Sequence, residues 1–399
     1  MQMKAKCLLI ILFFSIFIYS CNSSNVEGEK ATKTIDLTGV LFSDEPQLLS
    51  LFVDSIEYVR LSDTPLIPDL RMVHLAEDSK GYLYVDFSNI SKYTPEGKYI
   101  KSLFKKGQGP GEIYAKNAPG IYNKSGNYVL VSNYGAPYNK YTLEGEFIET
   151  VKERIEDVNF DVLAYWNDCE IFRYEKDDNP DKGDIVNLDS VYFIRVKDKA
   201  GKIIYQLPNY HFDIKAVSPG HGTIVILGGI VDCGEMSEKR FWIKPNYVDT
   251  VYCTSDWTDV HPYYIIKLSD RAADYTWSVH MKVGDITRND ASKEQLGTIY
   301  ALESGVLFSY IFNREQQGVG FCPANGKGKT VSKLFKNDID EYCPPLDLWQ
   351  TMGYKLFYQK DGYLYLLVDA FKFFEEGARS PFADLTEDSN PVLIKLKLK

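Results

Sequence analysis

The stretch "GQGPGEIY", Gly107 to Tyr114, combines backbone freedom with polar and aromatic side chains that could contact a ligand. Glycine-rich loops bind phosphate groups when they run into Gly-Lys-Ser/Thr or follow the G-x-G-x-x-G spacing. This stretch has neither feature. The one Gly-Lys-Thr of the chain, Gly328 to Thr330, has Pro323 where the leading glycine of a phosphate loop belongs. The sequence therefore does not indicate phosphate or dinucleotide binding.

Pro110 and Gly111 instead predict a tight turn at this place. Proline at the second position and glycine at the third position of a four-residue turn specify type II, in which the third residue needs a positive φ. Gly109 precedes the proline and is therefore held extended. We expect Gly107, Gly109, Pro110 and Gly111 to form a structural corner between a strand that ends near Phe104 and the next sheet.

Chemistry that needs a metal or an activated nucleophile finds no motif in this sequence. No G-x-S-x-G pentapeptide marks a strained nucleophile turn. The histidines have no H-E-x-x-H or H-x-H spacing, so zinc and copper sites are not indicated. They are His74, His211, His221, His261 and His280. The acidic stretch from Asp177 to Asp189 fails as a calcium loop, because Lys182 and Leu188 occupy the positions of its glycine and its last acidic ligand. We therefore predict neither a metal nor a cofactor.

The N-terminal segment carries the pattern of an export signal. Two lysines precede an apolar run of eleven residues, Leu8 to Ile18, which is too short to span a bilayer because about 20 helical residues are needed. Cys21 follows a small residue at the end of this run, as in a bacterial lipobox. We expect residues 1–20 to be a signal peptide, Cys21 to be lipidated, and the polar residues 21–33 to be a flexible tether. An ordinary signal peptide with a nearby cysteine is the alternative.

Five further cysteines follow the lipobox, and none forms a C-x-x-C pair of the kind that binds metals or transfers disulfides. They are Cys169, Cys233, Cys253, Cys322 and Cys343. An oxidising compartment would permit one or two disulfides, with Cys322 and Cys343 as a candidate pair. Buried free thiols are the equal alternative.

The charge of the chain argues against one class of partner. Asp and Glu number 55 against 45 Lys and Arg, which gives a formal net charge of −10. Nucleic-acid binding needs basic patches, and the only dense basic run is the short C-terminal "KLKLK". We therefore do not expect a nucleic-acid partner.

Two long stretches of the chain, residues 80–103 and 125–151, repeat each other. Their matching glycines are Gly81 with Gly126 and Gly97 with Gly145, at offsets of 45 and 48 residues. Each stretch reads as a strand, a short loop, a second strand with a K-Y-T-x-x-G turn, and a further strand. Weaker echoes begin at Ser190, Lys239 and Lys360. The unit predicts a four-stranded meander.

Repeats of about 40–50 residues built from four strands are the signature of a β-propeller, in which each small sheet buries its faces against its neighbours. An aromatic content of 14% also favours strands. We therefore expect an all-β propeller over residues 34–399. The spacing of the repeats leaves both six and seven blades open. Because propellers often close by pairing strands from both chain ends, the alternating segment Pro391 to Lys399 is expected to close the ring.

The chain resembles the six-bladed β-propeller lipoproteins of Bacteroides-like bacteria, which are distantly similar to NHL-type propellers. The resemblance rests on the lipobox and tether, on "SIEYVRLSDTP" at Ser55 to Pro65, and on "GQGPGE" at Gly107 to Glu112. It is good over residues 34–151 and diffuse beyond Phe160. It implies six blades of four antiparallel strands and no established reaction.

A propeller binds ligands near the mouth of its central channel, and the corner provides candidates if it lies on that face. Gln108, Glu112 and Tyr114 would then be ligand-rim residues. The favoured alternative is that Glu112 accepts backbone N–H bonds in the corner and Tyr114 packs between blades.

The function that this sequence predicts is that of an extracytoplasmic lipoprotein, held in the outer membrane of a Gram-negative bacterium by its N-terminal lipid. It would act as a binding or scaffolding module for a glycan, a peptide or a partner protein. The alternative is a propeller lyase or hydrolase with its active site at the central channel.

Overall fold

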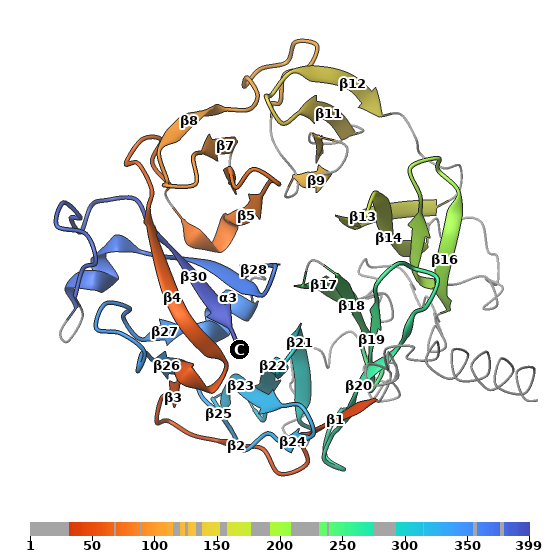
Figure 1. Ribbon diagram of the computed structural model, residues 1–399, viewed down its shortest axis with the longest axis vertical. Helices are drawn as coiled ribbons and strands as arrows, with labels where there is room; N and C mark the ends of the chain where they lie inside the picture. Colours follow the sequence, from red (N-terminus) through yellow and green to blue (C-terminus); the bar gives the residue numbers. More distant parts are fainter. Residues whose placement is uncertain are drawn as a thin grey trace, which may run out of the picture.

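Six small β-sheets stand in a ring in the computed structural model, and the secondary structure of the described residues is nearly all β (Figure 1). The described residues are 32–67, 69–87, 89–114, 120–123, 127–132, 138–151, 158–176, 192–208, 231–237, 239–273, 293–313, 315–353, 357–375 and 379–399. The predicted six-bladed β-propeller is therefore confirmed. The signal segment, Cys21, most of the tether and the stretch 177–189 lie outside the described residues.

Blades one to three are each formed by four consecutive antiparallel strands. Blade one contains β5 (His74–Glu77), β6 (Leu83–Asp86), β7 (Ile90–Tyr93) and β8 (Tyr99–Ser102). Blade two contains β9 (Ile121–Asn123), β10 (Tyr128–Ser132), β11 (Tyr138–Thr142) and β12 (Phe147–Val151). Blade three contains β13 (Val158–Trp166), β14 (Cys169–Lys176), β15 (Tyr192–Lys197) and β16 (Ile203–Pro208). The two strong sequence repeats thus fall in blades one and two.

Blades four and five depart from this plan because segments from elsewhere in the chain join them. Blade four contains β17 (Val231–Ser237), β18 (Arg240–Pro245), β19 (Thr250–Thr254) and β20 (His261–Lys267), extended by β1 (Lys33–Asp36) and β24 (Gly326–Lys327). Blade five contains β21 (Gln295–Leu302), β22 (Gly305–Ile311) and β23 (Gln317–Pro323). Its fourth-strand position is held by a single bridge between Val319 and Ser332.

Short elements cover the outside of blades five and six. β2 (Leu41–Phe42) pairs with β25 (Thr330–Val331), and β26 (Leu334–Lys336) joins β3 (Gln47–Leu48) to β27 (Leu346–Asp347). The helices of the described residues are α3 (Leu348–Gly353) and the 3₁₀ turns η1 (Leu49–Leu51), η2 (Leu70–Met72) and η5 (Ala370–Phe374). Within the described ranges, no helix is long and apolar enough to cross a membrane.

Blade six closes the ring with strands from both ends of the described chain. It contains β28 (Tyr358–Lys360), β29 (Tyr363–Val368), β30 (Val392–Leu398) and β4 (Val53–Arg60). β30 pairs with β4 in antiparallel register, from Val392 opposite Arg60 to Leu398 opposite Val53. The expected closure by the C-terminal strand is confirmed.

The five cysteines of the propeller are free thiols. The sequence left open a disulfide between Cys322 and Cys343 or free thiols, and the structure has no disulfide between these two residues. Burial raises the pKa of the Cys322 thiol to about 11. A thiol with such a pKa is protonated near neutral pH and is a poor nucleophile.

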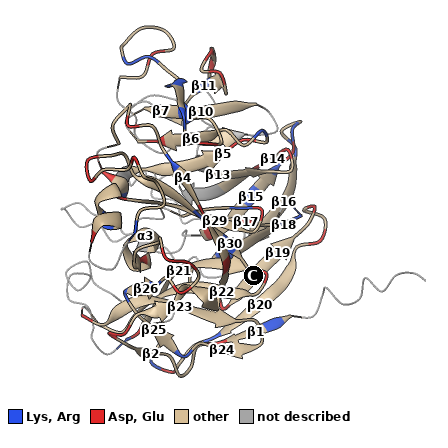
Figure 2. Ribbon diagram, turned by 60° about the vertical axis from the view of Figure 1, so that its left-hand side comes forward, with Lys and Arg blue, Asp and Glu red and all other residues tan. Residues whose placement is uncertain are grey.

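The charged residues of the described ranges are spread over the blades. Figure 2 shows acidic and basic positions interspersed along the strands and their connecting loops. Long lysine stems also pack on aromatic rings. Lys140 of β11 lies 4.4 Å from the ring centre of Tyr128, and Lys395 of β30 lies 5.2 Å from that of Tyr365. Such cation–π contacts hold the third strand of a blade onto the second.

Candidate functional site

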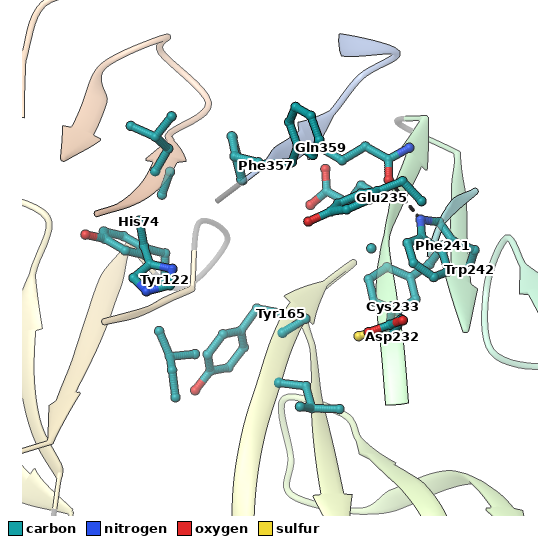
Figure 3. A pocket seen from close by; sticks show the side chains of 18 of the residues that line it. His74, Tyr122, Tyr165, Asp232, Cys233, Glu235, Phe241, Trp242, Phe357 and Gln359 are labelled. Carbon is teal, nitrogen blue, oxygen red and sulfur yellow. Dashed lines mark hydrogen bonds between the residues drawn. The ribbon is translucent and has the colours of Figure 1, made fainter. Parts of the chain in front are cut away.

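A cavity of about 530 Å³ lies at the centre of the ring (Figure 3). The innermost strands of all six blades contribute to its wall: β5, β9, β13, β17, β21 and β28. Because these strands stand around one axis, residues far apart in the sequence converge there. The volume is in the range of small-molecule binding sites, about 300–1,000 Å³. This cavity is the candidate functional site.

Aromatic side chains form much of the cavity wall. They are Tyr122, Tyr138, Tyr165, Phe241, Trp242, Tyr300, Phe357 and Tyr358. The ring of Tyr300 packs edge-on against Phe357 at 5.3 Å and against Trp242 at 6.4 Å between ring centres. These contacts join three blades and give the wall rigid apolar surfaces.

Two carboxylates, those of Asp232 and Glu235, stand among the polar side chains of the wall. Figure 3 shows His74 and Tyr122 on one side of the cavity and Asp232, Glu235 and Gln359 across from them. No lysine or arginine of the described ranges lines the cavity. The wall therefore favours neutral or positively charged ligands over anions.

One amide in the wall is fixed by two hydrogen bonds that connect three blades. The indole N–H of Trp242 donates to Gln359 Oε1 at 3.0 Å, and Gln359 Nε2 donates to the carbonyl of Ala301 at 2.8 Å. Gly234 faces the same indole, and a Cβ there would lie only 3.1 Å from its nitrogen. The indole and the amide are thus held in one arrangement, which pre-organises this side of the cavity.

Burial keeps four phenols of the wall neutral at physiological pH, those of Tyr122, Tyr165, Tyr300 and Tyr358. Burial, together with the carboxylate of Glu170, raises the pKa of Tyr165 far above its ordinary value. The pKa of Tyr358 is raised by burial and by Glu235, and that of Tyr122 by burial and by Asp86. Neutral phenols can both donate and accept hydrogen bonds.

The described residues contain no group of three or more His, Cys, Asp or Glu side chains that could hold a metal ion. Of the histidines, His74 lines the cavity, whereas His261 lies on β20 with its Nδ1 3.3 Å from the carbonyl of Asp259. His211, His221 and His280 are outside the described ranges.

The corner at Gly107–Glu112 joins β8 of blade one to β9 of blade two. Gly111 has a φ of 71°, and the N–H of Glu112 donates to the carbonyl of Gly109 at 3.0 Å. The carboxylate of Glu112 accepts from the N–H of Gly109 at 2.9 Å. The side chain of Glu112 thus fastens the backbone of its own loop.

Neither Gln108, Glu112 nor Tyr114 lines the central cavity. The carbonyl of Gly111 accepts from the Tyr141 hydroxyl at 3.1 Å, and a Cβ on Gly111 would meet the ring of Phe147 on the outermost strand β12. Tyr114 is 67% exposed. The corner therefore packs against the outer half of blade two, and a ligand-binding role for these three residues stays a prediction.

The residues that do line the cavity could not be recognised from the sequence. The repeats begin near the second strand of a blade, so the innermost strands lie outside them. Each innermost strand brings a different side chain to the axis, such as His74 from β5 and Glu235 from β17. A motif search depends on local spacing, whereas this site is assembled from separate segments of all six blades.

The chain matches the model of a family described as a domain of unknown function, DUF4934, over residues 32–397. None of the curated proteins is significantly similar to it.

Solved structures share its fold at low sequence identity. A protein from Bacteroides fragilis, whose name describes export as inferred, has a TM-score of 0.55 and 12% sequence identity. The similarity covers 92% of this chain and 100% of that protein's chain. A DUF4221 member from Bacteroides vulgatus has a TM-score of 0.45 and 13% identity, with 87% and 97% covered. An oligogalacturonate lyase from Vibrio parahaemolyticus has a TM-score of 0.34 and 10% identity, with 86% and 97% covered. The first of these supports the fold, and the other two are too distant to carry an argument.

Proposed function

This chain belongs to the DUF4934 family, a domain of unknown function, and we propose that it is an extracytoplasmic binding module whose central cavity holds a neutral glycan. The composition of the cavity wall carries this proposal. Eight aromatic side chains and two carboxylates line the cavity, together with the fixed amide of Gln359. Sugar rings present apolar C–H faces that pack on aromatic rings, and their hydroxyls bind carboxylates and amides.

The charge of the wall defines the class of glycan further. Asp232 and Glu235 line the cavity and no cationic side chain of the described residues does. A uronic acid or a sulfated sugar would therefore meet like charge in a partly desolvated site. Neutral hexoses and their oligomers avoid this repulsion.

A peptide that inserts a lysine or arginine side chain is the second candidate ligand. Its cation would be attracted both by the faces of the tyrosine and tryptophan rings and by the two carboxylates. The presence of Asp232 and Glu235 beside the aromatic wall is the observation that favours this candidate.

The proposed location follows from the N-terminal sequence. The apolar segment before Cys21 supports export, and the lipobox pattern supports lipid attachment at this residue. The similar Bacteroides fragilis protein is named for inferred export, which agrees with this route. Mass spectrometry of the mature protein should find a lipidated Cys21 as its first residue. An unmodified N-terminus elsewhere would overturn the anchor.

A ligand screen of the purified protein tests the binding function. Neutral oligosaccharides, acidic oligosaccharides and basic peptides are compared by calorimetry or on an array, and we expect a neutral glycan to bind. Glu235→Gln should weaken binding about tenfold, which is the loss expected for one hydrogen bond to a charged group, about 1.5 kcal/mol. Binding of acidic glycans alone would contradict the proposal.

The corner loop provides the matched control. Glu112→Gln combined with Tyr114→Ala changes two side chains that do not line the cavity, so affinity should be unchanged if the cavity is the site. Loss of binding in this variant, with the Glu235→Gln protein unaffected, would move the site to the predicted loop rim. Shortened glycan products after long incubation would instead favour the lyase or hydrolase alternative.

A further inference from the structure

A second cavity, of about 670 Å³, lies beside blades four and five. Its wall includes Lys244 of β18, the turn from Asn246 to Asp249, residues between Leu268 and Ala273, and Gln295 to Thr298 of β21. Asp232 of β17 lines both this cavity and the central one, whereas Lys244 lines only this one. We call this space the lysine cavity.

Lys244 is a buried cation with few partners. Lys244 is 6% exposed, and its ammonium donates to the carbonyl of Pro245 at 2.8 Å. This is the one hydrogen bond that the ammonium makes in the described structure, although it has three N–H donors. A buried charge without enough acceptors is strongly unfavourable, and a ligand could supply the acceptors that the described residues do not.

Three aspartates surround the lysine cavity at different depths. Asp232 is the cross-strand neighbour of Lys244, and its Oδ2 accepts from the N–H of Ile299 at 3.2 Å. Asp249 and Asp270 are exposed residues of the wall. Among the described residues, neither Asp249 nor Asp270 forms an ion pair with Lys244. At its buried end the cavity therefore presents the ammonium of Lys244 with Asp232 on the neighbouring strand, and near solvent it presents the carboxylates of Asp249 and Asp270.

We propose that the lysine cavity binds a zwitterion, an amino acid or a short peptide whose carboxylate reaches Lys244 and whose ammonium meets the exposed aspartates. A carboxylate is the acceptor that best completes a buried ammonium, because the hydrogen bonds are charge-assisted. A free ammonium at the other end of the ligand offsets the carboxylates of Asp249 and Asp270. A simple dianion has no ammonium that could meet the exposed aspartates. A neutral polyol would leave the charge of Lys244 uncompensated.

The state of Lys244 gives the proposal a physical readout. Burial lowers the pKa of its ammonium to about 8, against the opposing effect of Asp232 and Asp249. A bound carboxylate would raise this pKa again, so binding at pH 8 should take up protons. Calorimetry in two buffers with different ionisation heats measures that uptake.

The experiment uses the purified protein and a panel of L-amino acids and dipeptides, followed by the amide and the N-acetyl derivative of the best binder. We expect the amide to bind about 10- to 100-fold more weakly, as for the loss of hydrogen bonds to a charged group. Lys244→Met should produce the same loss and abolish the proton uptake. Glu235→Gln, which changes only the central cavity, should leave amino-acid binding intact.

A second variant keeps the test valid if Lys244→Met fails to fold. Asp249→Asn changes an exposed residue, and it should weaken binding of the free amino acid several-fold but not binding of its N-acetyl derivative. Equal affinity for the acid and its amide would overturn the proposal. So would wild-type affinity in Lys244→Met, preferential binding of neutral polyols, or no binding of any panel member to the wild-type protein.

Discussion

The same tight turn joins the third and fourth strands of blades one, two and three, but its glycine meets different surroundings. Gly97, Gly145 and Gly201 have φ values of 85°, 80° and 77°. In each turn the glycine N–H donates to the carbonyl of the residue three positions earlier, at 2.9 Å. The backbone thus needs glycine in all three blades, because a side chain is strained at such a φ.

The turns of blades one and two also touch the preceding blade. A Cβ on Gly97 would lie 2.2 Å from the carbonyl oxygen of Arg60, and one on Gly145 would lie 2.0 Å from that of Leu103. Arg60 ends β4 and Leu103 follows β8, which are the outermost strands of blades six and one. No described atom lies within 4 Å of the corresponding position at Gly201. In blades one and two, glycine is therefore required both by the backbone of the turn and by the close contact with the preceding blade.

Removing Val392 to Lys399 should break the first of these junctions and have the largest effect. β30 pairs with both β29 and β4, and Val392, Ile394 and Leu396 are fully buried. Each such side chain contributes about 1.5–3 kcal/mol, so their sum is comparable to the whole stability of a domain, about 5–15 kcal/mol. β29 would become an exposed edge, β4 would lose the strand with which it pairs, and the contact between Gly97 and Arg60 would be lost.

We expect this truncated protein to show no cooperative thermal unfolding by calorimetry and to be cut rapidly by protease. Removal of residues 1–31, which precede the described chain, serves as the length control and should preserve the transition. An unchanged melting temperature without β30 would mean that the ring does not depend on this closure.

Gly145→Ala and Gly201→Ala separate the two roles of the glycine. Gly201→Ala should cost about 1–2 kcal/mol, the penalty for a left-handed backbone with a side chain. Gly145→Ala should cost about 1–3 kcal/mol more, because its methyl group overlaps the carbonyl of Leu103 and the junction must shift. Urea unfolding of both variants measures the difference. Equal losses of stability would show that the contact with blade one adds nothing.

The blade plan could be predicted because its signals are local. The spacing of Gly97 and Gly145, the turn residues around them and the alternation of the C-terminal strand all follow from neighbours in the sequence. The weak echo at Ser190 falls on β15 and β16 of blade three, including the turn at Gly201. This pattern could not predict the close approach of the Leu103 carbonyl to Gly145, because that contact depends on how one blade stacks on the next.

The candidate sites depend still more on stacking. Trp242, Tyr300 and Gln359 come from three blades and meet only when the ring closes. Lys244 reads in the sequence as an ordinary polar position between Ile243 and Pro245, yet it is buried. The corner at Gly111 could be predicted because a turn depends on neighbouring residues in the sequence. Its distance from the axis of the ring could not be predicted.

Gly111→Val tests whether this corner is a junction like those at Gly97 and Gly145. A β-branched residue at a φ of 71° is strained by about 1–3 kcal/mol. Its Cβ would also approach the ring of Phe147 to 2.7 Å, but this ring is 42% exposed and can move. We therefore expect a loss of about 2 kcal/mol in urea unfolding, below that of Gly145→Ala.

Gly39→Ala is the matched control for Gly111→Val, since no described atom lies within 4 Å of its Cβ position. Its stability should stay within about 0.5 kcal/mol of the wild type. If Gly111→Val is equally neutral, the corner tolerates side chains and its glycine is not required by the fold.

The turns also differ at the residue before the glycine, which is Glu144 in blade two. We expect this difference to have the smallest effect on stability. Its carboxylate reaches back to blade one, where it accepts from Lys92 Nζ at 2.6 Å, whereas Ala200 holds this place in blade three. The hydrogen bond from Lys92 lowers the pKa of Glu144. Because the folded pKa is below the unfolded one, the stabilisation is present above the ordinary value of 4.5 and is lost as the pH falls through the folded pKa.

Glu144→Gln should therefore lower the free energy of unfolding by about 0.5–1 kcal/mol at pH 7, since the carboxylate is 63% exposed and partly screened. The difference from wild type should shrink below pH 4.5 and vanish in stronger acid, where both side chains are uncharged. Glu96→Gln changes the same position of the turn in blade one. The carboxylate of Glu96 is hydrogen-bonded to Thr94 of its own turn, so this substitution should have a smaller effect on the free energy of unfolding. A Glu144→Gln loss that is equally large at pH 3 and pH 7 would show that the side chain acts through packing and not through its charge.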